Sequence, residues 1–270
     1  MQTVDLAYIE QLIEQNLPQG DDVVCQAARY SVCCGGKRFR PQLLLNAAQA
    51  CGKITPNAEK LACAIEFVHN YSLIHDDLPC MDNDDFRRGK PTCHKKYGET
   101  IAVLAGDLLL NLAAEIAFSG DFSVVGYAEA CKFLFEMSGN KGMIHGQSLD
   151  LFTPVQSVNV AIETASAKTA ALIRASLVCG ALSANALPEY LPIIDKIALS
   201  LGIAYQIADD LADADKSEKS FLGAMSAVKC VELFDKYIQD VKEHVAKLPY
   251  DFGFVSRVMD WLCDIVKPAW

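Results

Sequence analysis

Apolar residues recur at three- and four-residue spacing along almost the whole chain of 270 residues, and this helical periodicity limits the fold more than any other feature. Gly and Pro residues separate the apolar windows, and alternating strand patterns are absent. Many windows are apolar around most of their circumference, which is typical of helices buried inside a large bundle. We therefore expect an all-α fold, a large helical bundle with helices over residues 5–16, 22–34, 41–51, 57–77, 99–118, 123–138, 160–181, 190–214 and 226–247.

The composition indicates one domain over residues 1–270, because no Pro/Gly/Ser-rich linker, charge block or internal repeat divides the chain. A formal net charge of −10 argues against a nucleic-acid partner. The most apolar window, from Ile101 to Phe118, is interrupted by Asp107 and Glu115. We therefore expect no membrane span.

The cysteine pattern bears on the compartment. The chain has 11 Cys, an odd number, and no C-x-x-C pair, so neither a disulfide framework nor a zinc ribbon is supported. Residues 1–10 carry acidic side chains and no charged-then-apolar signal pattern. These features predict a reducing, cytoplasmic location.

Two clusters of aspartates stand out against the apolar background. The first lies at the end of the predicted helix 57–77, where Pro79 disfavours further α geometry, and it contains Asp76, Asp77 and Asp82. The second contains Asp209 and Asp213, whose four-residue spacing places them on one helix face.

Both clusters lie toward the C-terminal ends of predicted helices, where the macrodipole disfavours a carboxylate by up to ~1 kcal/mol. A multivalent cation would reverse this penalty. Oxygen ligands without His or Cys at ligand spacing favour Mg²⁺. For either cluster alone, an acidic helix end at the surface is an equally good explanation; two such clusters with basic residues nearby are harder to explain in that way.

Basic residues near the acidic clusters predict anion binding. Gly35 and Gly36 precede three cations at the start of the helix over 41–51, and a helix N-terminus with adjacent Lys or Arg favours phosphate: Lys37, Arg38 and Arg40. A second basic group follows the first acidic cluster directly: Arg87, Arg88 and Lys90. Solvated surface charge is the alternative for any one of these residues.

Further polar residues interrupt apolar helical windows. His69 and Ser72 share a helix face with Asp76, which favours contact with a ligand over a packed core role for His69. Lys168, followed by Thr169, lies in the middle of the predicted helix 160–181, and Gln206 precedes the second acidic cluster. Because an unpaired buried Lys is costly, we expect Lys168 to face an anion.

The stretch Tyr71-Ser-Leu-Ile-His-Asp-Asp-Leu-Pro-Cys-Met-Asp-Asn-Asp-Asp-Phe-Arg-Arg-Gly-Lys-Pro-Thr, followed by Leu104-Ala-Gly-Asp107, resembles the trans-isoprenyl diphosphate synthases of the bacterial farnesyl and bacterial/plant geranylgeranyl type. The Gly-Lys-Arg loop, Gly146-Gln147 with Asp150, Lys168-Thr169 and the stretch from Tyr205 to Asp213 follow in the order of that family. The resemblance covers about residues 20–215.

The resemblance implies an isoprenoid synthase fold with a central cavity, a homodimer, and Mg²⁺, with Mn²⁺ as a substitute. By analogy, the metal ligands would be Asp76, Asp82, Asp209 and Asp213, with Asp77 nearby. The residues that contact an allylic diphosphate would be Arg87, Lys168, Thr169 and Gln206. Those that hold isopentenyl diphosphate would be Gly36, Lys37, Arg40, His69 and Arg88.

The residues at the fifth and fourth positions before the first aspartate help to set product length in this family, and here they are Tyr71 and Ser72. Tyr71 lies about 7.5 Å below Asp76 along a helix axis. An aromatic residue at this position resembles the farnesyl (C15) synthases, so we expect a C15 product. The alternatives are a geranylgeranyl (C20) synthase, a terpene cyclase, and a catalytically weak partner subunit of a heteromeric synthase.

One region departs from the family pattern. The segment 214–221 runs almost directly into the next helix, where the family has a longer loop with a lysine that helps to close the site. Lys216 or Lys219 is the candidate replacement.

Overall fold

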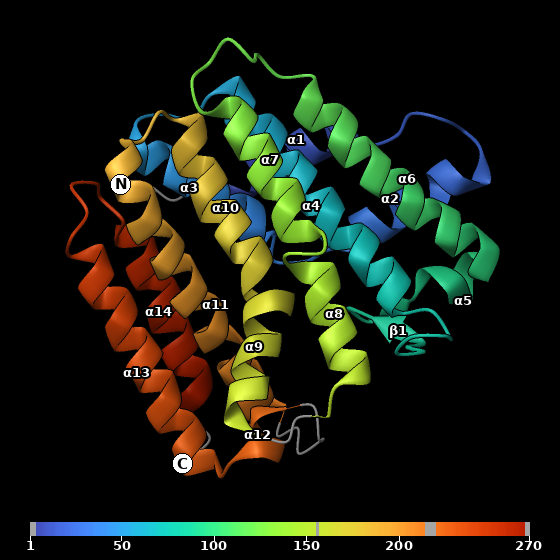
Figure 1. The fold of residues 1–270 in the computed structure, drawn as a ribbon. Coiled ribbons are helices and arrows are strands. Elements are labelled where there is room, and N and C mark those ends of the chain that lie inside the picture. Colours follow the sequence, from blue (N-terminus) through green and yellow to red (C-terminus); the bar gives the residue numbers. More distant parts are fainter. Residues whose placement is uncertain (1–3, 155–156, 214–219, 268–270) are drawn as a thin grey trace.

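The computed structural model describes residues 4–154, 157–213 and 220–267, and it confirms the all-α prediction (Figure 1). Its longer helices are α1 (Leu6–Asn16), α2 (Val23–Cys33), α3 (Phe39–Cys51), α4 (Pro56–Asp76), α6 (Glu99–Phe118), α7 (Tyr127–Ser138), α8 (Met143–Phe152), α9 (Val158–Lys168), α10 (Ala170–Ser183), α11 (Leu191–Ala212), α13 (Ala227–Val245) and α14 (Gly253–Val266). The short elements are β1 (Phe86–Arg87), β2 (Lys90–Pro91), α5 (Cys93–Tyr97), η1 (Pro188–Tyr190) and α12 (Phe221–Ala224).

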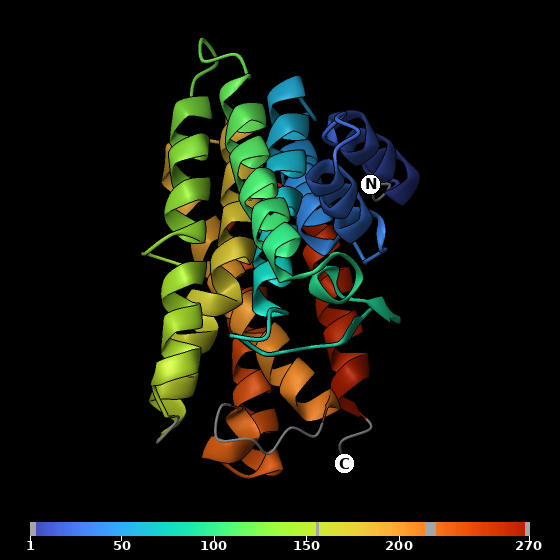
Figure 2. The ribbon, with the colours of Figure 1, turned by 90° about the vertical axis from the view of Figure 1, so that its right-hand side faces the viewer.

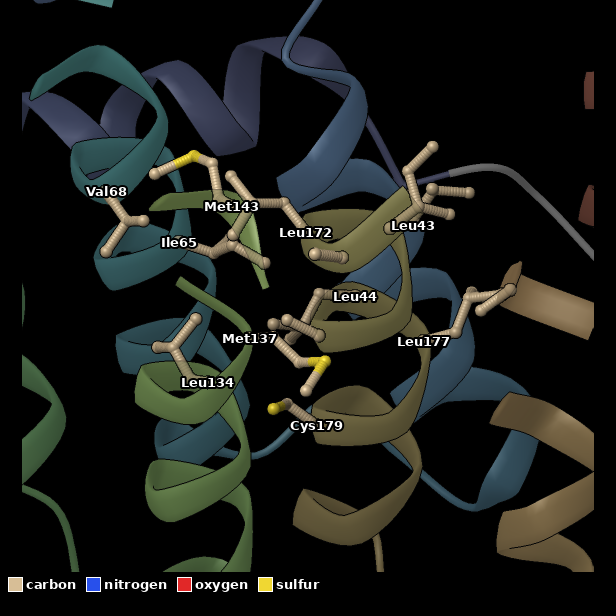
Figure 3. Close-up of a cluster of buried hydrophobic side chains, with 14 of the residues drawn as sticks. Leu43, Leu44, Ile65, Val68, Leu134, Met137, Met143, Leu172, Leu177 and Cys179 are labelled. Atoms are coloured by element: carbon tan, nitrogen blue, oxygen red, sulfur yellow. The ribbon is translucent and has the colours of Figure 1, made fainter. Parts of the chain in front are cut away.

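Helices α4 and α10 form the centre of the bundle. Helix α4 packs on α3, α6 and α10, and α10 packs on α3, α7 and α11. Nearly every side chain of α10 is buried, which explains why its sequence is apolar on all sides. Figure 3 shows the core between these helices, with Leu44 of α3, Ile65 of α4, Leu134 of α7 and Leu172 of α10 pointing toward one another.

Several predicted boundaries differ from the observed ones. The single helix predicted over 160–181 is wrong, because α9 and α10 meet at Thr169 with a bend of 45°. A continuous apolar pattern gives no sign of a bend that depends on packing against α8 and α11. Helices α8 and α14 and the two-residue strands of the β1–β2 hairpin were not predicted, and α3, α7 and α11 begin or end within a few residues of expectation.

The bundle brings the ends of α4 and α11 to the same side. Both helices run toward the lower end in Figure 1, where α8, α9, α12 and the β-hairpin also lie, and the perpendicular view in Figure 2 agrees. Helix α4 ends at Asp76 and α11 at Ala212, so both acidic clusters lie at helix C-termini, as the sequence predicts.

Two described helices are long and apolar enough to cross a membrane by length and composition alone: α6, and the run Pro188–Ala212 that contains α11. The bent pair α9–α10 passes the same test as a broken span. In the bundle, α6 packs on α4 and α2, and α11 packs on α10 and α13. The absence of a membrane span therefore stays a prediction.

Candidate functional site

Three adjoining cavities open at the end of the bundle where the acidic clusters lie. The cation cavity, of about 440 Å³, is lined by residues of α3, α4, the β-hairpin, α11 and α14. The central cavity, of about 330 Å³, shares Arg40 and His69 with it. The acidic cavity, of about 230 Å³, shares Lys168 and Thr169 with the central cavity. The shared residues make these cavities neighbouring parts of one site.

Three of the four cations that line the cation cavity have no carboxylate partner in the described part of the chain: Lys37, Arg40 and Arg88. The Arg40 Nη1 donates to His69 Nε2 over 3.2 Å, and Arg40 Nε is buried without a partner among those residues. Burial lowers the pKa of Arg40, and burial together with the Arg40 charge holds the pKa of His69 well below its usual range. The cavity therefore has a surplus of positive charge that an anion would stabilise.

Arg38, the fourth cation, has a different role. Its guanidinium is 1% exposed and bonds Glu66 and Glu10, each at 2.8 Å. Glu66, the acidic residue that lines the cation cavity, is thus already neutralised. Burial opposes the charge on Arg38, but the hydrogen bonds and charges of Glu10 and Glu66 outweigh it and raise its pKa.

The glycine loop and the β-hairpin meet closely. Gly36 has φ +130°, and a Cβ there would lie 2.7 Å from Arg88 Cζ, so a side chain at this position would push the guanidinium away. Arg88 Nη1 donates to the Gly35 carbonyl. The glycine pair therefore approaches Arg88 closely, and this contact joins two segments that are more than 50 residues apart.

The central cavity is the most apolar of the three. Its polar residues include His69, Ser72 and Asp76, so the helix face predicted from their spacing faces one cavity. Tyr71 also lines it; the side chain is 5% exposed, and its hydroxyl has no partner among the described residues. Apolar lining comes from Leu73, Met81, Met143 and Ile144.

Asp76 is the acidic residue of this cavity. Its carboxylate accepts a hydrogen bond from Gln147 Nε2 of α8. Burial raises its pKa to about 6, the charge of Lys168 opposes the shift, and the charge of Asp82 adds to it. A positive ion or ligand beside Asp76 would restore the ionised form.

The acidic cavity joins the two aspartate clusters. Asp82 of the first cluster and Asp210 of the second both line it. Lys168 is the last residue of α9, not a mid-helix residue as predicted, and its Nζ bonds Asp150 at 2.6 Å. The anion expected beside Lys168 is thus the Asp150 carboxylate in this structure.

A chain of hydrogen bonds crosses the acidic cavity. Thr169 Oγ1 donates to Gln206 over 2.5 Å, Gln206 Nε2 donates to Asp210 over 2.8 Å, and Asp210 accepts from the backbone N–H of Phe221 over 2.7 Å. The chain links the α9–α10 bend to α11 and α12.

Asp210 was not singled out from the sequence. The sequence pointed instead to Asp209 and Asp213, which lie at the end of α11 and do not line the three cavities. Burial, followed by the charge of Asp213, raises the pKa of Asp209.

Arg87 and Asp77 are engaged with one another. Arg87 Nε lies 2.8 and 3.0 Å from the two Asp77 carboxylate oxygens, and Nη2 lies 2.5 Å from one of them. The pair borders a separate small cavity of about 30 Å³. The structure therefore does not bring Arg87 into the same cavity as Lys168, Thr169 and Gln206.

Within residues 4–154, 157–213 and 220–267, no group of three or more His, Cys, Asp or Glu side chains is arranged to hold a metal ion. The four predicted metal ligands thus do not form a complete protein site by themselves. Lys216 and Lys219 lie outside the described residues.

A family model described as polyprenyl synthetase matches residues 21–225. Farnesyl diphosphate synthase of Escherichia coli (strain K12) is 43% identical over 203 residues, which are 73% of this chain and 68% of that protein. The chloroplastic heterodimeric geranylgeranyl pyrophosphate synthase large subunit 1 of Arabidopsis thaliana is 42% identical over 203 residues, covering 72% of this chain and 55% of that protein.

The match therefore spans little more than half the length of that plant relative. Among solved structures, an FPP/GFPP synthase from Zymomonas mobilis in its apo form superposes with a TM-score of 0.81 at 33% identity, covering 97% of this chain and 94% of that one. This likeness confirms the expected isoprenoid synthase fold. The family match and the relatives show that the chain belongs to the polyprenyl synthetase family.

Proposed function

We propose that the chain is a trans-prenyltransferase that condenses isopentenyl diphosphate with dimethylallyl or geranyl diphosphate to make farnesyl diphosphate. The observation that carries the proposal is the cation cavity, where Lys37, Arg40 and Arg88 lack carboxylate partners in the described chain. A diphosphate would supply the missing negative charge.

The neighbouring cavities suit the second substrate. The acidic cavity is lined by Lys168, which bonds Asp150, and by Thr169 and Gln206, which bond each other. These three side chains would contact an allylic diphosphate. The apolar central cavity between the two anion sites suits the hydrocarbon tail and excludes water from a carbocation.

The donor set fits Mg²⁺. The charge of Asp82 adds to the raised pKa of Asp76, and Asp76 is the last residue of α4, where the helix dipole disfavours an uncompensated carboxylate. Mg²⁺ is usually held by one or two carboxylates together with substrate phosphates, which agrees with the incomplete protein site.

Asp76, Asp82 and Asp209 would hold the metal, with Asp213 beside them. When bound, Mg²⁺ would supply neutralising charge at the departing diphosphate. Mn²⁺ is the expected substitute.

The chemistry needs no protein nucleophile. Lys168 would stabilise charge on the leaving diphosphate as the allylic C–O bond breaks. Lys37, Arg40 and Arg88 would hold the diphosphate of isopentenyl diphosphate so that its double bond forms the new C–C bond with the allylic carbon. The proton released after bond formation would pass to the departing diphosphate.

Tyr71 supports a C15 product. Its buried ring lines the same cavity as Asp76 and lies more than one helical turn before it, so a growing chain would meet the ring. The likeness to farnesyl diphosphate synthase of E. coli agrees, whereas the geranylgeranyl synthases at 42% identity keep a C20 product as the alternative.

Product analysis tests the proposal. The purified chain is incubated with isopentenyl and dimethylallyl diphosphates with Mg²⁺, with Mn²⁺, or with EDTA. We expect a C15 product that depends on the metal; a dominant C20 product would overturn the length assignment. Arg40→Met is the matched variant, and it should weaken isopentenyl diphosphate binding while the fold is retained.

A catalytically weak partner subunit is the second candidate, because the sequence 214–221 is shorter than the corresponding loop of the family. No turnover by the chain alone, with turnover restored by a second subunit, would favour it. We also propose a cytoplasmic homodimer; light scattering of the purified protein measures its mass against 29.4 kDa per chain.

A further inference from the structure

Helix α14 contributes to the site although it lies beyond residues 21–225, the segment that matches the family model. It packs on α11 and α13. Its half-buried Trp261 ring lies 6.0 Å from the Phe39 ring and 5.9 Å from the Tyr205 ring, measured between centroids. Phe39 and Tyr205 stack on each other at 5.5 Å. These three rings form an aromatic cluster at the edge of the cation cavity.

Lys37 lies over this cluster. Its Nζ is 4.6 Å from the centroid of the Trp261 ring, within the range of a cation–π interaction. Trp261 and Lys37 also line a second groove, of about 280 Å³, on the outer side. The indole is thus part of the wall between that groove and the cation cavity, and the ammonium rests on it.

No other contact holds the Lys37 ammonium within the described chain. The side chain is exposed and makes no hydrogen bond or ion pair there. Asp209 is near enough for the Lys37 charge to act on its carboxyl group. The flexible Lys37 side chain could turn toward Asp209 or toward the cation cavity. The cation–π contact with Trp261 favours the position in the cavity.

We propose that Trp261 is a positioning residue that holds the Lys37 ammonium in the cation cavity, where it can bind the diphosphate of isopentenyl diphosphate. The proposal rests on the proposed function for the identity of that substrate. The ring lowers the entropy that Lys37 loses on binding, and it makes no contact with the reacting carbon atoms.

Steady-state kinetics provide the first test. Trp261→Leu keeps an apolar side chain and removes the π face, so we expect the KM for isopentenyl diphosphate to rise about two- to fivefold. The kcat and the KM for the allylic substrate should stay within twofold. Trp261→Phe should recover part of the loss. Val258→Ala, which changes a side chain that lines the outer groove but not the cation cavity, is the matched control and should leave both KM values unchanged.

A double-variant cycle separates positioning from packing. In a Lys37→Met background, Trp261→Leu should have no further effect on the KM for isopentenyl diphosphate, since the ammonium is already gone. If the two effects add, or if Trp261→Leu lowers kcat as much as it raises that KM, the ring acts through packing and the proposal fails.

Fluorescence gives a readout that needs no turnover. Trp261 and Trp270 are the 2 tryptophans of the chain, so Trp270→Phe leaves Trp261 as the single indole. Inorganic pyrophosphate, titrated into this protein, should change its emission, and Lys37→Met should abolish the change.

The outcomes distinguish two failures. If Lys37→Met does not weaken pyrophosphate binding, the function proposed for the cation cavity is wrong. If Lys37→Met does weaken pyrophosphate binding, two results would show that only the role of Trp261 is wrong. One is that Trp261→Leu has no effect on pyrophosphate binding; the other is that pyrophosphate leaves the Trp261 emission of the Trp270→Phe protein unchanged.

Discussion

Arg38 and Lys37 are adjacent cations that the structure assigns to opposite tasks, and replacing each in turn tests the assignment. Arg38 bonds Glu66, Glu10 and the Val32 carbonyl, all at 2.8 Å, and its side chain is 1% exposed. Lys37 is exposed and has no ion-pair partner in the described chain. We expect Arg38→Met to destabilise the protein strongly and Lys37→Met to weaken anion binding instead.

The magnitude follows from the carboxylate that Arg38→Met would leave behind. Glu66 is 2% exposed, and breaking a buried pair by removing one partner costs about 3–5 kcal/mol. Glu66 keeps a hydrogen bond from Asn70 at 3.1 Å, so we expect the lower end, ~3 kcal/mol. For a chain of this size the melting temperature would fall by roughly 6–12 °C. Lys37→Met removes no buried partner and should change stability by only about 0.5 kcal/mol.

Urea unfolding followed by circular dichroism measures the first effect, and titration with inorganic pyrophosphate measures the second. Arg38→Met combined with Glu66→Leu is the control, because removing both charges should recover much of the lost stability. Equal unfolding midpoints for Arg38→Met and the parent protein would refute the structural role of Arg38. So would a loss of pyrophosphate binding in Arg38→Met under conditions where it is fully folded.

Three further predictions follow from the site. Tyr71→Ala should enlarge the central cavity and shift the product distribution toward C20, and an unchanged distribution by chromatography would contradict Tyr71 as its floor. Burial raises the pKa of Asp76 from 3.8 to about 6. The ionised carboxylate therefore lowers the stability of the metal-free protein above pH 6, and this loss of stability disappears below pH 3.8. Asp76→Asn should therefore be more stable than the parent at pH 7 without metal, by about 1–2 kcal/mol after allowance for partial exposure, and equal to it near pH ~3.5, as measured by urea unfolding. A Cβ at Gly146 would clash with the backbone of Lys168, so Gly146→Ala should separate α8 from α9, cost about 1–3 kcal/mol and raise the KM for the allylic substrate; Ser148→Ala, at an exposed position of the same helix, is its control.

Helical spacing was enough to predict much of the site. The positions of His69, Ser72 and Asp76 follow from the regular geometry of one helix, so their common cavity could be predicted from sequence. The cations after Gly36 line one cavity together, although Arg38 among them is paired with Glu10 and Glu66.

Contacts that depend on tertiary packing could not be predicted. Arg38 has φ 47° at the start of α3, and its side chain points into the core and pairs with Glu66. Lys37 and Arg40 on either side of it have no carboxylate partner in the described chain. Residue type alone does not indicate this difference. Arg87 was expected beside Lys168, but its guanidinium lies against Asp77 instead. Trp261 was missed because α14 itself was not predicted.

The bend at Thr169 separates the helical registers of α9 and α10. Inserting or deleting one residue in a continuous helix rotates everything beyond it by about 100°. At this bend the almost fully buried α10 can keep its packing while α9, which contributes Lys168, changes in length. The segment that we propose to contact the allylic diphosphate can therefore be altered with little effect on α10, which makes α9 a favourable segment for redesigning substrate preference.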